Sequence, residues 1–154
     1  SDSSFYTKED FYKKNCSGTL QPVLKTIKSA YEKTIIEITT LVIPPLNDSE
    51  DEIESLIGFI ADIDPEIPFH ISRYFPRNKR FEPPTSEHIL RRIEKQAKQK
   101  LKHVYVGNSG GFDSNTYCAQ CGEILITREA YSGKIRNLKN GKCLQCGKML
   151  YGAF

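Results

Sequence analysis

The chain has 154 residues, of which 38% are hydrophobic and 27% charged, with five cysteines and no tryptophan. This length suits one ordinary globular domain, and the composition excludes the disordered and collagen-like classes. No apolar run approaches the roughly 18–20 residues of a membrane span, and the first residues lack the basic and apolar segments of a signal peptide. We therefore expect a cytoplasmic protein with no membrane partner, in which paired cysteines indicate metal ligands before disulfides.

The net charge of +3 is unevenly distributed along the chain. Residues 48–66 hold eight acids and no base, residues 73–102 hold ten bases and three acids, and residues 115–154 hold six bases and two acids. Solvated helix faces are the expected explanation, and steering of an anionic ligand is the alternative. A pI near 8.5 does not by itself indicate a nucleic-acid partner.

Amphipathic periodicity predicts three helices in the first two thirds of the chain. The first follows Pro22, a favourable first-turn residue, and the second follows Ser49, which has the spacing of a capping box with Glu52. The third begins near Thr85, which we expect to be its N-cap. A short helix is also expected at residues 7–12.

Three apolar, β-branched runs alternate with these helices, at residues 35–43, 69–74 and 104–106. Helix and strand patterns repeated at this spacing predict parallel strands joined by right-handed crossovers. The fold class is therefore α/β, and either an open sheet or a barrel satisfies the pattern.

The pattern changes after Val106, where a glycine-rich segment begins and the helical periodicity does not return. About 40 residues remain, too few to form a stable core of their own without a structural metal ion or disulfides. We expect an α/β domain over residues 1–108, a linker over residues 109–114 and a small domain over residues 115–154.

The small domain carries the strongest chemical motif, two copies of CxxCG. The four cysteines are Cys118, Cys121, Cys143 and Cys146. Two intervening residues let both sulfurs of a pair face one ion, and the glycine lets backbone amides approach the thiolates. Four thiolates at this spacing favour tetrahedral zinc, and the segment between the pairs is long enough for a hairpin. The sequence therefore predicts a structural zinc ribbon.

The cysteines also have alternative roles, namely an iron site, disulfides or a catalytic zinc site. An iron site of the rubredoxin type shares the four-cysteine chemistry, and the sequence does not separate iron from zinc. Two disulfides are disfavoured in a cytoplasmic protein, and catalytic zinc is disfavoured because four protein ligands leave no open position. Cys16 has no neighbouring histidine to activate it, so we assign it no role.

Several segments, taken together, resemble the radical SAM proteins that are similar to pyruvate-formate-lyase-activating enzymes, and most of all the AmmeMemoRadiSam branch. The resemblance covers nearly the entire chain in the family's order. The segments that carry it are residues 11–18, 22–27, 39–48, 70–76, 83–85 and 103–108, and the CxxCG ribbon.

The resemblance implies that this chain corresponds to the C-terminal half of such an enzyme. The family's CxxxCxxC motif, which holds a 4Fe-4S cluster, is absent from the 154 residues, as are the barrel strands expected before Ser1. Pro45 stands where the family usually has glycine, and residues 1–8 match poorly. The implied fold is a partial parallel (β/α) barrel, a half-barrel, followed by the zinc ribbon.

The family chemistry is reductive cleavage of S-adenosylmethionine by the cluster, with the barrel orienting the cofactor. Because strand C-terminal ends line ligand sites in parallel α/β folds, the resemblance implies cofactor contacts from Thr40, His70 and Arg73. Arg73 is expected to contact a carboxylate or ribose, or to pair with an acid such as Glu37. No catalytic residue is assigned, since the chain alone lacks the cluster motif and is expected to be inactive by itself.

The partners expected from this interpretation are the missing N-terminal barrel half or a protein substrate. The competing hypothesis is a non-enzymatic zinc-ribbon module that docks protein or nucleic acid, with nucleic acid disfavoured. A half-barrel that survives as a scaffold is a third interpretation.

Overall fold

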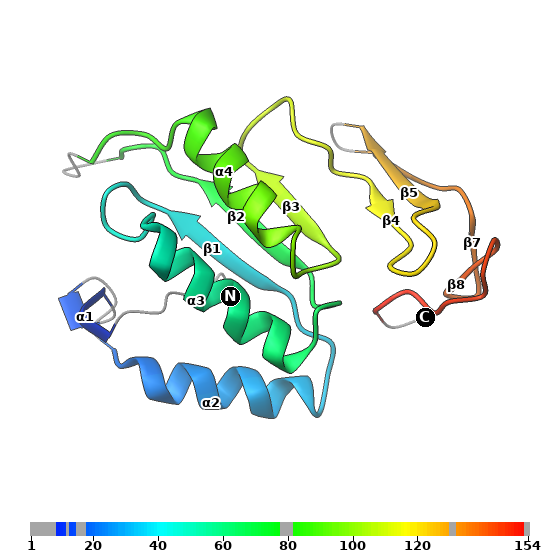
Figure 1. Ribbon diagram of the computed structural model, residues 1–154, viewed down its shortest axis with the longest axis horizontal. Coiled ribbons are helices and arrows are strands. Elements are labelled where there is room, and N and C mark those ends of the chain that lie inside the picture. The colour runs from blue at the N-terminus through cyan, green and yellow to red at the C-terminus, as the bar shows by residue number, and fades with distance from the viewer. Residues whose placement is uncertain (1–8, 12, 15–17, 78–81, 130–131, 153–154) are drawn as a thin grey trace. The chain divides into compact units, whose positions relative to one another are not determined.

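The computed structural model describes residues 9–11, 13–14, 18–77, 82–129 and 132–152. Within it the chain separates into two compact units, Ser1–Gly110 and Gly111–Phe154. The first unit is a mixed α/β structure, and the second consists of short antiparallel strands around the four cysteines (Figure 1). In the described part of the chain, no helix has the length and apolar character needed to cross a membrane.

The first unit is built on a three-stranded parallel sheet in the order β1-β2-β3. The strands are β1 (Ile38–Val42), β2 (Phe69–Arg73) and β3 (Val104–Gly107). Ile38 is in register with Phe69, and Phe69 with Val104. The predicted parallel arrangement is therefore observed. β1 and β2 are shorter than the apolar runs that indicated them, and β3 is one residue longer.

Helices α3 (Glu50–Ile63) and α4 (Glu87–Ala97) connect the strands and cover one face of this sheet (Figure 1). Two helices precede β1, α1 (Glu9–Phe11) and α2 (Leu20–Tyr31). Alternate strand residues, Ile38 and Val42 in β1 and Phe69 and Ile71 in β2, are buried on the helix-covered face. They form the core of the unit together with the apolar stripes of α3 and α4.

The helix starts differ from two sequence predictions. Ser49 precedes α3, but its side chain makes no capping hydrogen bond, so the predicted capping box is not formed. The N-cap of α4 is Ser86, whose hydroxyl accepts from the Ile89 amide, and not Thr85. Thr85 is fully buried and bonded elsewhere, so it is unavailable to the helix end.

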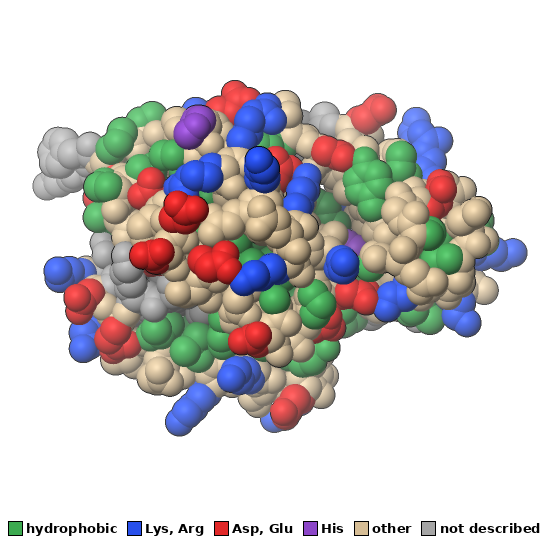
Figure 2. Space-filling view, in the orientation of Figure 1, with side chains coloured by type: hydrophobic (Ala, Val, Ile, Leu, Met, Phe, Trp, Pro, Cys, Tyr) green, Lys and Arg blue, Asp and Glu red, His purple; other side chains and the backbone are tan. Residues whose placement is uncertain are grey.

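The two oppositely charged blocks of the sequence meet on the helix layer. Lys100 forms an ion pair with Glu54 of α3, and the Arg92 guanidinium of α4 donates to the Asp48 carbonyl at 2.6 Å. Figure 2 shows acidic and basic side chains next to one another over this face. One ion pair thus joins the basic block to the acidic block, and both of its side chains are about half exposed to solvent.

The second unit contains a three-stranded antiparallel sheet and a two-stranded hairpin. The sheet is formed by β4 (Thr116–Tyr117), β5 (Ile124–Glu129) and β6 (Ser132–Ile135), and the hairpin by β7 (Leu138–Lys139) and β8 (Lys142–Cys143). Asn140 and Gly141 between β7 and β8 have φ of 50° and 71°, as a tight two-residue hairpin turn requires. The segment between the cysteine pairs, long enough for a hairpin, forms one from β5 and β6.

Candidate functional site

Each CxxCG segment forms a tight turn that brings its two cysteines to the same side. The Gly122 amide donates to the Cys118 carbonyl at 3.0 Å, and the Gly147 amide donates to the Cys143 carbonyl at 2.8 Å. Both glycines have φ of 76°, a left-handed conformation that side chains disfavour. The two turns therefore share one geometry, and this geometry explains the glycine that follows each pair.

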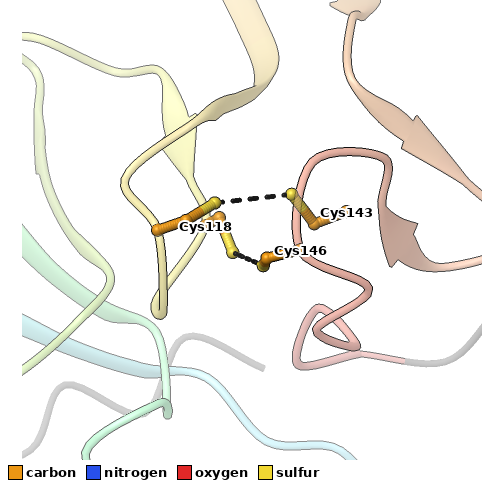
Figure 3. A group of neighbouring side chains, drawn as sticks. Cys118, Cys143 and Cys146 are labelled. Atoms are coloured by element: carbon orange, nitrogen blue, oxygen red, sulfur yellow. Dashed lines mark hydrogen bonds between the residues drawn. The ribbon is translucent and has the colours of Figure 1, made fainter.

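The two turns face one another and place all four sulfurs in one cluster (Figure 3). The four Sγ atoms lie within 4.8 Å of one another. Two of these separations join the two turns, with Cys118 Sγ 3.5 Å from Cys146 Sγ and Cys121 Sγ 3.7 Å from Cys143 Sγ. Cys118 and Cys143 are buried, whereas Cys121 is exposed.

This cluster has the dimensions of a tetrahedral metal site. Zinc–sulfur bonds of about 2.3 Å at tetrahedral angles separate the sulfurs by about 3.8 Å, close to the distances found here. The cluster could therefore bind a metal ion such as zinc. Because all four positions are protein ligands, a bound ion would serve the fold and leave no open coordination position for a substrate.

The ionisation of the thiols also depends on a cation. Burial opposes ionisation of Cys118, but backbone amides of Cys121 and Gln120 donate to its sulfur and its pKa falls to about 7. The Glu123 amide favours the Cys121 thiolate, yet desolvation and the neighbouring sulfurs raise its pKa to about 12. The pKa of Cys146 is also raised, despite the Lys148 amide that donates to it, because desolvation and the Cys118 and Cys143 sulfurs oppose its charge. A divalent ion would supply the charge that lets these sulfurs ionise together.

A second group of polar side chains lies on the face of the parallel sheet opposite α3 and α4. His70 Nε2 lies 3.1 Å from Glu37 Oε2, and the His70 ring stacks on Tyr105 with centroids 5.2 Å apart. Asn108, directly after β3, donates from Nδ2 to Ser72 Oγ at 3.0 Å. No described helix covers this face, which we call the open face.

The structure places the three predicted cofactor residues on two different faces. Only His70 belongs to the open face. Thr40 is 2% exposed on the helix-covered face, and Arg73 falls on the same side by strand alternation. The Arg73 guanidinium donates from Nε to the Thr85 carbonyl at 2.8 Å and lies over the Phe75 ring. Glu37 pairs with His70, so it is not the partner of Arg73.

Two buried residues that the sequence did not single out for these roles fix the C-terminal ends of the strands. Thr85 Oγ1 donates to the Val42 carbonyl at 2.6 Å and accepts from the Tyr74 amide at 2.9 Å. The Asn47 side chain accepts from the Ile43 amide at 2.6 Å and donates to the Leu41 carbonyl at 2.8 Å. Only the loop conformation brings these groups together, so no local sequence signal reveals them. Cys16 lies outside the described residues.

Comparison with known proteins gives a similar chain of greater length. The uncharacterized protein MJ0808 of Methanocaldococcus jannaschii is 40% identical over 148 residues, which are 92% of this chain and 44% of that protein. The chain thus spans less than half the length of this relative. No protein-family model matches the chain.

Proposed function

We propose that the chain is the C-terminal portion of a radical SAM protein of the activating-enzyme type. Its open sheet face forms part of the wall of the S-adenosylmethionine and substrate site, and its cysteine cluster is a structural zinc ribbon. The proposal rests on the resemblance of the sequence segments and on the open face. The length of the Methanocaldococcus relative is consistent with further polypeptide around such a portion.

The open face is the observation that carries the proposal. Parallel sheets are normally covered on both faces, because their crossover helices and neighbouring layers bury them. On this second face the Ser72 hydroxyl and the Asn108 amide lie near the strand C-terminal ends, where parallel α/β folds bind ligands. The His70 imidazole and the Tyr105 phenol lie on the same face, nearer the N-terminal ends of β2 and β3. A closed (β/α) barrel turns this face toward its interior.

The residues of the open face have distinct expected roles. His70, held by Glu37 and stacked on Tyr105, presents a fixed ring edge for a hydrogen bond to the cofactor or substrate. Ser72 and Asn108 supply further hydrogen-bonding groups on the same face, at the C-terminal ends of β2 and β3. Thr40 is left out of this wall because it is buried beneath the helices. When bound, the 4Fe-4S cluster supplies the electron that cleaves S-adenosylmethionine, and it must be held by residues outside this chain.

The wall is tested in the longer polypeptide that carries this segment, reconstituted anaerobically with iron and sulfide. We expect His70→Ala to weaken binding of S-adenosylmethionine or its substrate, with the cluster content unchanged. Glu87→Ala, an exposed change on α4, is the matched control. Failure of the longer polypeptide to bind S-adenosylmethionine would refute the proposal.

The ribbon is tested on the chain alone. Metal analysis after anaerobic reconstitution is expected to find zinc in a one-to-one ratio with the chain and no four-iron cluster. The four sulfurs suit a single tetrahedral ion, and no other group of three or more suitable side chains gathers in the described residues. A stoichiometric four-iron cluster in this chain would contradict the assignment.

The alternative function is a zinc-ribbon module that docks a partner without catalysis. The exposed apolar side chains of the second unit favour it, since Ile135 is 68% and Leu144 62% exposed beside several lysines. Salt-sensitive binding of a nucleic acid or acidic protein by the chain alone would favour this function over the first.

A further inference from the structure

The outer edge of β1 has backbone groups that face away from the sheet. The Ile38 amide donates to the Pro68 carbonyl at 2.9 Å, so Ile38, Thr40 and Val42 direct their backbone groups toward β2. Alternation then directs the N–H groups of Thr39 and Leu41 and the Thr39 carbonyl outward. Within the described residues, none of these three outward groups has a hydrogen-bond partner.

The next outward groups along β1 are already satisfied by Asn47. Its side-chain amide donates to the Leu41 carbonyl and accepts from the Ile43 amide. A residue of a parallel neighbouring strand makes this same pair of bonds, donating to one residue and accepting from the residue two positions later. Asn47 is 2% exposed, so its amide is a fixed part of the edge. The side chain thus occupies the place of one strand residue opposite Val42, and the preceding places have no partner among the described residues.

The helix layer extends past the same edge. The Tyr31 hydroxyl of α2 donates to Asp64 Oδ2 at 2.7 Å, and the Lys28 ammonium lies over the Phe59 ring of α3. α2 therefore packs beside α3, on the side away from α4, and lies beyond β1 (Figure 1). Although α2 is amphipathic, none of its residues is fully buried, and its apolar residues Val23, Leu24 and Ile27 are only half-buried.

A parallel strand beside β1 would both pair the outward backbone groups of this strand and cover the half-buried apolar residues of α2. In a right-handed crossover, the helix between two parallel strands lies over them on one face of the sheet. α3 stands in this relation to β1 and β2, and α4 to β2 and β3. α2 has the corresponding position for β1 and a strand that precedes α2 in the polypeptide. The other edge, at β3, also directs the backbone groups of Val104 and Val106 outward, but no half-buried helix in the described part of this unit extends beyond it.

We propose that β1 is an internal strand of the complete protein, paired at Thr39 and Leu41 with a parallel strand from polypeptide that precedes α2. One residue of that strand donates to the Thr39 carbonyl and accepts from the Leu41 amide, and Asn47 ends the pairing at Val42. The added strand covers the apolar side of α2. This inference rests on the proposed function only in requiring that the chain is part of a longer polypeptide.

Amide hydrogen exchange on the 154-residue chain tests the inference. The probe is the unmatched part of the Methanocaldococcus relative, produced as a separate polypeptide and added to the chain. We expect a complex in which the Thr39 and Leu41 amides exchange slower by roughly tenfold or more, because each gains a hydrogen-bond acceptor. The Val104 and Val106 amides are the internal reference and should change less.

Two variants separate the edges. Thr39→Pro removes an outward N–H without breaking the β1–β2 ladder, and Val106→Pro does the same at the other edge. Thr39→Pro should abolish the complex and Val106→Pro should retain it, with exchange of the Ile71 amide reporting that each variant is folded. Because the exchange measurement uses the unaltered chain, the inference stays testable if a proline variant fails to fold.

Four outcomes would overturn the inference. They are the lack of a complex, a complex without protection at Thr39 and Leu41, protection confined to β3, and protection of β1 by a second copy of this chain. A protected β1 edge in a complex that binds no S-adenosylmethionine would refute the proposed function and leave this inference intact. A complex that binds S-adenosylmethionine but leaves the β1 edge unprotected would refute this inference and leave the proposed function intact.

Discussion

The two units of the chain differ in the residues that form their cores. The α/β unit buries large aliphatic and aromatic side chains completely, among them Phe69, Ile57 and Leu90. The buried cluster of the ribbon consists of Leu125 and Leu150 together with Cys118 and Cys143. Half of this small core therefore consists of cysteines of the candidate metal site, whereas the buried hydrophobic residues described in the α/β unit include no cysteine.

Because their cores differ in this way, we expect the two units to unfold independently of one another. Burial of apolar surface stabilises the first unit in proportion to area, at about 25 cal/mol per Å². A segment of about 40 residues buries too little apolar surface to be stable by burial alone. A bound metal ion commonly supplies the missing stability in such small domains. Each prediction below alters one unit and follows the other.

The largest effect is expected from Cys143→Ser. Cys143 is 2% exposed, and its loss removes both a metal ligand and a core residue. Structural zinc in small domains contributes about 10–16 kcal/mol, so the ribbon should unfold. Two-dimensional NMR should show loss of dispersed resonances for residues 115–150, with those of β1–β3 unchanged. Gln145→Ser, at an exposed position of the same turn, is the control, and a folded ribbon in metal-free Cys143→Ser would contradict the prediction.

The converse change is Phe69→Ala in β2. Phe69 is fully buried, so the truncation leaves a cavity and should lower the free energy of unfolding of the α/β unit by about 3–5 kcal/mol. Urea denaturation followed by circular dichroism measures the change, and zinc content should stay the same. Phe75→Ala, at a side chain 47% exposed, should cost far less. Equal effects of the two changes would show that the core is misassigned.

Between pH 6 and pH 8 we expect the pH to act on the ribbon. Metal binding displaces protons, from Cys121 with a pKa of about 12 and from Cys146 with a raised pKa, so acid competes with the ion. The zinc affinity should fall by at least about a hundredfold from pH 8 to pH 6, which a chelator competition assay would measure. The urea midpoint of the α/β unit is the reference. A pH-independent affinity would argue against thiolate ligands.

Thr85→Val should destabilise the α/β unit moderately. The change removes the hydroxyl that bonds the Val42 carbonyl and the Tyr74 amide and leaves both groups unpaired. The expected loss is about 1–3 kcal/mol in urea denaturation, with no effect on metal content. Thr85→Ser keeps the hydroxyl and should recover most of the loss. A valine variant as stable as the parent would show that these bonds contribute nothing net.

The smallest effect is expected from Glu54→Gln on α3. Hydrogen bonds from Lys100 and Gln96 lower the pKa of Glu54, so its contribution exists above its unfolded-state pKa and is lost as the pH falls through the folded value. Exposed ion pairs are screened and mobile, so the urea midpoint at neutral pH should not shift measurably. Glu87→Gln, which breaks another exposed pair, should behave alike.

The element order and the cysteine cluster could be predicted because their signals are local. Helical periodicity located α2, α3 and α4, and the CxxCG spacing led to four sulfurs in one cluster. The face of each strand could not be predicted in the same way. Residues 35–43 are apolar at both odd and even positions, so nothing in the run says whether Thr40 lies beneath the helices or on the open face.

Contacts between segments that are distant in the sequence could not be predicted either. Thr85 follows two prolines and has the appearance of a helix cap, yet the fold brings it to Val42 and leaves the cap to Ser86. Glu37 is a single acid within an apolar run, and only the register of β1 against β2 makes it the partner of His70. These pairings depend on strand order and register, which no local pattern encodes.

The buried Thr85 hydroxyl has a mechanical consequence for the rim of the sheet. It joins the end of β1 to the segment after β2, while the Thr85 carbonyl holds Arg73 and the next residue caps α4. Two connections of the chain, the one after β1 and the one from β2 to α4, therefore share one anchor. A molecule at the strand ends that displaced one of them would also strain the hydrogen bonds to the other.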